Sequence, residues 1–150
     1  MKKIYNLRTE PTKEIYRKLL LYSLKYCGSF ILVLRSTILQ SPSAKKIIKK
    51  LEPYVLKISE DSEWPGTKLT DNTATVYKFK LNRSTLKLLL ESAQSLYSWI
   101  QPNLPEDLCI IRLNNEPLLV TISHEKDGYL ELTPVEKEDL LTKIPELKLS

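Results

Sequence analysis

The sequence predicts an α+β domain in which about four helices pack on a mixed, mostly antiparallel sheet of five or six strands, in the order αβαββαβββα. Four segments repeat apolar residues at helical spacing, and six others have the apolar runs or the alternation of strands. Turn signals in the last third of the chain join three of these strands as hairpins, which require antiparallel pairing. With 150 residues the chain is long enough for one core, so we expect a single domain over residues 1–150.

The first helix is expected to open within Thr9–Thr12 and to run to Lys25 or Tyr26. Pro11 is tolerated in its first turn, and Thr9 or Thr12 can cap it. Gly28 then supplies a left-handed stop. Residues 30–34 follow as five consecutive apolar side chains, which predicts a central strand covered on both faces.

The second helix is expected to begin at Ser41–Pro42, a capping serine followed by proline at the first helical position, and to end at Pro53. Its apolar residues recur at helical spacing. Four cations fall on the opposite, polar side: Lys45, Lys46, Lys49 and Lys50. Residues 54–59 then predict a strand.

Residues 60–73 are the longest segment without a periodic pattern, and such loops are often functional or mobile. Residues 75–81 alternate between apolar and polar side chains, which predicts a half-exposed strand. Asn82 or Ser84 caps a third helix, whose apolar stripe continues to Ile100.

The last third of the chain predicts three strands and a final helix. The strands are expected over residues 108–113, 118–123 and 129–133. Thr133, followed by proline and by glutamate three positions later, predicts a capped helix from Pro134 to about Lys143.

Charge is unevenly distributed along the chain. Residues 1–60 carry 13 Lys or Arg and 4 Glu, a net +9, whereas residues 61–150 carry 10 basic and 14 acidic residues, a net −4. A two-signed molecule of this kind can steer association with a charged partner. The alternative is that both halves are simply solvated surfaces.

The composition excludes several kinds of chemistry. Three glycines leave no Gly-rich phosphate loop, and no run of about 18 apolar residues is present that could span a membrane. Cys27 and Cys109 lie far apart in apolar sequence, with neither metal-site nor disulfide-framework spacing. We therefore expect no cofactor and no metal. Because no secretory signal is evident, we expect a cytoplasmic protein with free thiols.

The segment around the single histidine is the main catalytic candidate. His124 could act as a general base, oriented by Glu125 or Asp127. However, adjacent residues on an extended strand point to opposite faces, so these side chains need not meet. The alternative, which we favour, is a hairpin turn whose polar residues face water.

Trp64 is the main candidate for a partner contact within the 60–73 segment. With Pro65 beside it, this tryptophan is either a buried plug or an exposed hot spot, because a tryptophan buries a large area with few rotatable bonds.

These observations favour a non-enzymatic protein that binds another macromolecule, such as an adaptor, a regulatory protein or an inhibitor. Its partner-binding candidates are Trp64, Pro65 and the four lysines of residues 45–50, and the partner expected is another protein. The alternative is a small enzyme that uses His124 beside the 60–73 segment. A further alternative is nucleic-acid binding through the same lysines.

Overall fold

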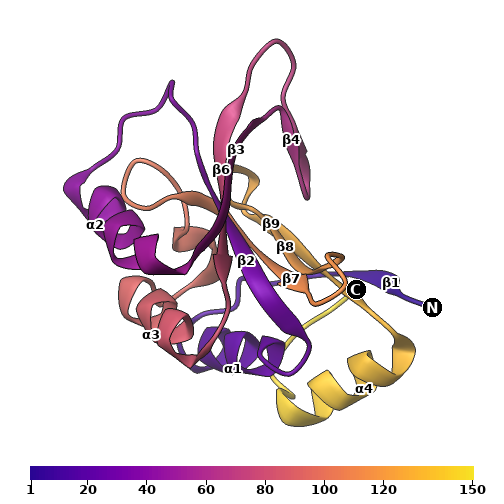
Figure 1. Ribbon diagram of the computed structural model, residues 1–150. Coiled ribbons are helices and arrows are strands. Elements are labelled where there is room, and N and C mark those ends of the chain that lie inside the picture. Colours follow the sequence, from indigo (N-terminus) through magenta and orange to yellow (C-terminus); the bar gives the residue numbers. More distant parts are fainter.

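The computed structural model describes all 150 residues and contains one seven-stranded antiparallel sheet, four helices and a short hairpin (Figure 1). The strands of the sheet are β1 (Lys3–Asn6), β2 (Cys27–Leu34), β3 (Val55–Asp61), β6 (Ala74–Lys80), β7 (Glu106–Arg112), β8 (Pro117–Ile122) and β9 (Asp127–Leu132). The helices are α1 (Lys13–Ser23), α2 (Pro42–Leu51), α3 (Arg83–Ser92) and α4 (Pro134–Lys143). The hairpin consists of β4 (Glu63–Trp64) and β5 (Thr67–Lys68). Three 3-10 turns, η1 (Glu52–Tyr54), η2 (Leu96–Ser98) and η3 (Ser123–Glu125), complete the fold.

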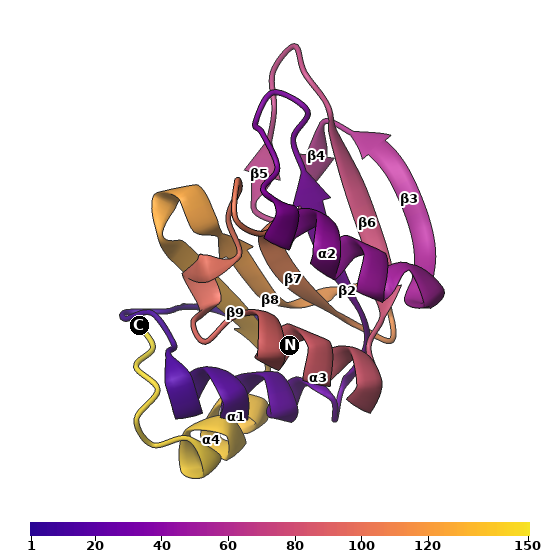
Figure 2. The ribbon, with the colours of Figure 1, turned by 90° about the vertical axis from the view of Figure 1, so that its left-hand side faces the viewer.

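The strand order is β1-β9-β8-β7-β2-β6-β3, and every neighbouring pair is antiparallel. Figure 2 shows α1, α2 and α3 in front of the sheet, with α4 beside α1. Side chains from all four helices and from the facing side of the sheet form one cluster of 27 buried residues. The α+β architecture and its four helices are therefore confirmed, but the sheet has seven strands rather than five or six, and it contains no parallel pair.

Strand β1 and the β4–β5 hairpin account for most of the difference from the predicted order. Strand β1 has only four, mostly exposed residues, and its pairing partner β9 lies more than 120 residues away in the chain. Within residues 60–73, which carry no periodic pattern, β3 continues to Asp61 and β4 pairs with β5. Both elements depend on backbone pairing rather than on an apolar pattern, so periodicity could not reveal them.

Helix boundaries differ from the predictions in two places. Helix α1 ends at Ser23, and Gly28, the expected stop, lies inside β2. Helix α3 ends at Ser92 rather than near Ile100, because the chain beyond it becomes extended and hydrogen-bonds the segment before α1. The backbone of residues 94–96 exchanges hydrogen bonds of 2.7 and 3.1 Å with residues 11–13. These long-range bonds replace the helical ones.

The β4–β5 hairpin covers the face of the sheet opposite the helices. Gly66 in its turn has a φ of +87°, a conformation that side-chain-bearing residues rarely adopt. A Cβ at this position would lie 2.7 Å from a methyl group of Val120 on β8. Trp64 packs beside Val33 and Val76 in a small buried cluster of its own. The hairpin thus buries part of the sheet face that lies opposite the helices.

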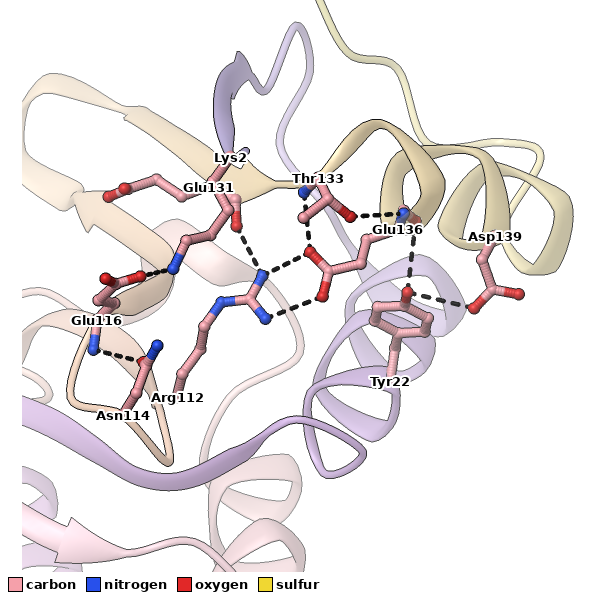
Figure 3. Close-up of polar contacts among 9 residues, drawn as sticks. All are labelled: Lys2, Tyr22, Arg112, Asn114, Glu116, Glu131, Thr133, Glu136 and Asp139. Carbon is pink, nitrogen blue, oxygen red and sulfur yellow. Dashed lines mark hydrogen bonds and ion pairs between the residues drawn. The ribbon is translucent and has the colours of Figure 1, made fainter.

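Arg112 at the end of β7 ties α4 to the sheet (Figure 3). Its guanidinium donates two hydrogen bonds, of 2.9 and 2.8 Å, to the carboxylate of Glu136 and a third, of 2.9 Å, to the carbonyl of Glu131. Glu136 also accepts the backbone N–H of Thr133, which completes a capping box at the start of α4. Burial alone would raise the pKa of Glu136, but the bonds from Arg112 and Thr133 outweigh it and lower that pKa.

None of the helices combines the length and the apolar character needed to cross a bilayer.

Candidate functional site

A buried polar cluster lies at one end of three neighbouring inner strands of the sheet. Because β2, β7 and β8 are antiparallel neighbours, the end of β2, the start of β7 and the end of β8 lie together. Arg35 follows β2, Glu106 and Asp107 begin β7, and Ser123 follows β8. Trp64 reaches the same place from the β4–β5 hairpin. We call these five residues the buried polar cluster.

Hydrogen bonds and an ion pair join the members of the cluster. The Nε atom of Arg35 lies 3.1 Å from Oε2 of Glu106. Asp107 accepts the indole N–H of Trp64 at 3.0 Å through one carboxylate oxygen and the backbone N–H of Ser123 at 2.9 Å through the other. The Arg35 guanidinium also lies 5.6 Å from the centre of the Trp64 ring, within cation–π range. These contacts attach the hairpin to the ends of β2, β7 and β8.

Burial sets the electrostatics of this cluster. Glu106 is 2% exposed, and its desolvation raises its pKa, an effect that the charge of Arg35 only partly offsets. Asp107 is fully buried and has a φ of +56°, a left-handed conformation that costs energy in a residue other than glycine. The hydroxyl of Ser123 has no hydrogen-bond partner. The cluster therefore combines buried charge with local strain.

His124 lies beside this cluster but on the surface. Its side chain is 42% exposed, and its Nε2 atom is 3.6 Å from the carboxylate of Glu125, which is beyond hydrogen-bond distance. Asp127 instead accepts the backbone N–H of Gly128. Donor atoms of His124, Glu106 and Asp107 come within 4.8 Å of one another.

The two carboxylates beside His124 already have partners within the chain. Both oxygens of Asp107 already accept hydrogen bonds, and Glu106 is paired with Arg35, whose charge would repel a cation. The hollow beside the β4–β5 hairpin is lined by residues of the hairpin, β8 and β9, and not by His124. The structure does not bring Glu125 or Asp127 into position to orient the imidazole.

Of the two placements considered for Trp64, the structure shows the buried one. Its side chain is 5% exposed, lies under Arg35 and is bonded to Asp107, which is the placement expected of a buried plug. Pro65 is half-buried, and its carbonyl accepts a weak hydrogen bond from the buried thiol of Cys109 at 3.8 Å. The sequence could not distinguish these placements, because the bond to Asp107 joins residues 43 positions apart.

Helix α2 presents its cations to solvent. Ala44, Ile47 and Leu51 are buried against the core, and the opposite side of the helix exposes Lys45, Lys46, Lys49 and Lys50. None of the seven ion pairs of the protein includes any of these four lysines. Arg83 and Lys87 on the neighbouring helix α3 are also exposed, but they line a separate hollow between α1 and α3. We call the four α2 lysines the basic helical face.

A groove with an apolar floor runs between α2 and α3. It encloses about 180 Å³ and contains the apolar side chains of Ile47, Leu88 and Leu104. Lys46 and Lys50 stand along it on the α2 side. Sequence reasoning identified the lysines but missed this α2–α3 groove, because Leu88 and Leu104 come from segments that only the fold brings beside α2.

No family model, curated protein or solved structure matches this chain. The sequence-predicted candidates thus fall into two groups in the structure. The lysines form an exposed face on the helical layer. Trp64 and His124 lie at the ends of the inner strands, where Trp64 is buried and His124 is exposed.

Proposed function

We propose that this protein acts without catalysis, as a cytosolic protein that binds an acidic partner protein through the basic helical face. The observation that carries the proposal is the set of four exposed α2 lysines with no acidic partner within the chain. Unpaired surface cations gathered on one face create a positive potential, which speeds encounter with an acidic surface and disfavours basic ones.

The α2–α3 groove favours a protein over a nucleic acid as that partner. An interface between proteins combines an apolar centre with a polar surround, and here Ile47 and Leu88 lie between Lys46 and Lys50 on the α2 side and Glu91 and Ser92 on the α3 side. Single-stranded nucleic acid is bound by aromatic side chains on which bases stack, and arginine is the common reader of guanine. Helix α2 carries neither an aromatic residue nor an arginine.

A binding assay with defined probes tests the proposal. The probes are fluorescently labelled peptides rich in Asp and Glu, with a leucine at every third or fourth position, and single- and double-stranded oligonucleotides of equal charge. We expect the peptides to bind more tightly than the oligonucleotides. The variant Lys46→Glu/Lys50→Glu should lose about 10-fold or more in peptide affinity, because it reverses two charges beside the groove.

A matched control separates local contact from net charge. Lys3→Glu/Lys148→Glu changes the net charge by the same amount at exposed positions away from α2, and its affinity should change less than about twofold. Equal losses in the two variants would contradict the proposed face. Tighter binding of the oligonucleotides would favour the nucleic-acid alternative instead. Turnover of a small molecule that disappears in His124→Asn would favour the enzyme alternative.

A further inference from the structure

Strand β3 is an open edge of the sheet. It pairs with β6 only, and Figure 2 shows it at the margin of the sheet with no segment beyond it. Every second residue of such a strand directs its backbone N–H and C=O groups away from its one neighbour, where they can pair with a further strand.

The opposite edge of the sheet, at β1, is partly covered by the chain's own C-terminal residues. There the C-terminal residues pair with the outer side of the β1 segment. Asn6 and Ser150 exchange two backbone hydrogen bonds of 2.9 Å, and Arg8 donates another, of 3.0 Å, to Lys148. The chain therefore covers the end of the β1 edge, at residues 6–8, and leaves the β3 edge uncovered.

Two large apolar side chains on β3 are left largely uncovered by the rest of the chain. Leu56 and Ile58 are 56% and 55% exposed, although both are large and apolar. A β-bulge between Val55 and Lys57 ends the regular pairing with β6, so the regular part of the edge runs from Lys57 to Asp61. An exposed edge strand with apolar side chains is a surface that associates with another strand.

We propose that β3 pairs with β3 of a second copy of this chain, antiparallel and centred on Ser59, so that the two sheets join into one. In this register Lys57 of each copy lies directly opposite Asp61 of the other. The two Ile58 side chains lie diagonally across the junction, on one face of the joined sheet. The contact is isologous, as in most protein dimers.

The distribution of charge along β3 argues for a second copy as the occupant. Lys57 lies near one end, and Glu60 and Asp61 lie at the other, so antiparallel self-pairing sets unlike charges opposite each other, which parallel self-pairing would not do. Within the chain Lys57 lies directly opposite Lys78, an unfavourable cross-strand pair of like charges. The amide of Asn115 satisfies the Lys78 ammonium at 2.9 Å, whereas Lys57 has no ion-pair partner.

A charge exchange tests this pairing by sedimentation equilibrium. An interface of five residue pairs in total is small, so we expect a dissociation constant of about 10 to 100 µM for the wild-type dimer. Lys57→Asp and Asp61→Lys should each weaken the dimer about 10-fold, and the double exchange should restore it. Lys148→Asp, the matched control for net charge, should leave the dimer unchanged.

Three outcomes would overturn the proposal. They are a wild-type protein that stays monomeric up to about 500 µM, a double exchange that is as weak as the single variants, and open-ended polymers in place of a dimer.

A cysteine variant tests the register independently. Cys27 and Cys109 are buried, so Ser59→Cys introduces the one accessible thiol. Directly opposite residues of antiparallel strands have the spacing that a disulfide needs. Mild oxidation should therefore convert this variant to a covalent dimer, while Ser98→Cys, an exposed control on η2, should stay monomeric. Equal rates of cross-linking in the two variants would contradict the register.

Discussion

Replacing Glu136 should destabilise the protein more than replacing any exposed glutamate, because Glu136 neutralises a nearly buried arginine. The side chains of Arg112 and Glu136 are 10% and 13% exposed, and two hydrogen bonds of 2.8 and 2.9 Å join them. Removing one partner of a buried ion pair typically costs about 3 to 5 kcal/mol, since the other charge remains buried.

For Glu136→Ala we expect a loss of stability at the lower end of that range. In Glu136→Ala, Arg112 keeps its bond to the carbonyl of Glu131, which reduces the penalty, whereas loss of the capping box adds about 1 kcal/mol. We expect a total of about 3 kcal/mol. Glu136→Gln keeps one accepting oxygen but replaces the other with an NH2 group, so it loses the charge and the hydrogen bond from Arg112 Nη1, and about 2 kcal/mol is expected.

Urea unfolding followed by circular dichroism measures these differences in the free energy of unfolding. Glu138→Ala is the matched control, because Glu138 is exposed on the same helix and forms no ion pair; it should change stability by less than about 0.5 kcal/mol. In the double variant Arg112→Met/Glu136→Ala the cost should be smaller than the sum of the single costs. A Glu136→Ala protein as stable as the control would refute the role given to this pair.

Three further predictions follow from the same structure. First, the lowered pKa of Glu136 means that its stabilising contribution is complete above its unfolded pKa of about 4.3 and is lost as the pH falls through its folded pKa. The difference in unfolding free energy between wild type and Glu136→Gln should therefore shrink as the pH is lowered, and a constant difference would disprove this. Second, Gly66→Ala should cost about 1 to 3 kcal/mol, because alanine is strained at a φ of +87° and its Cβ meets β8. Limited proteolysis should then cut residues 60–73 faster than in wild type, and unchanged cleavage would count against the packing of the hairpin. Third, burial raises the pKa of Cys27 and of Cys109 to about 12, so neither thiol should react with Ellman's reagent at neutral pH until urea unfolds the chain. Rapid reaction of the native protein would show that a thiol is exposed.

The parts of the fold that the sequence predicts well are those with local signals. Helix α4 follows from Thr133 and Pro134, and the capping box that these residues imply is present. Helix α2 begins after Ser41 as predicted, although the Ser41 hydroxyl contacts Ser43 and Asn103 rather than capping the helix. The period of α2 also places its lysines on the polar side, where the structure exposes them.

The parts that the sequence does not predict depend on contacts between distant residues. Strand β1 exists because it pairs with β9, and helix α3 ends early because the chain after it bonds to residues 11–13. The burial of Trp64 depends on Asp107, and the open edge at β3 depends on the order in which seven strands assemble. No short segment contains this information, so neither the plug nor the edge could be derived from periodicity.

The two buried ion pairs contribute to the fold in opposite ways. Arg112 lowers the pKa of Glu136, so that pair favours the charged carboxylate and stabilises the attachment of α4. Desolvation raises the pKa of Glu106 despite the charge of Arg35, so the charged form of Glu106 costs free energy in the folded state. The cluster around Arg35 is therefore not explained by the strength of its ion pair. The hydrogen bonds of this cluster instead hold Trp64, and with it the hairpin, against the ends of the inner strands β7 and β8. Asp107 is central to that attachment, because one of its carboxylate oxygens accepts the indole N–H of Trp64 and the other accepts the backbone N–H of Ser123.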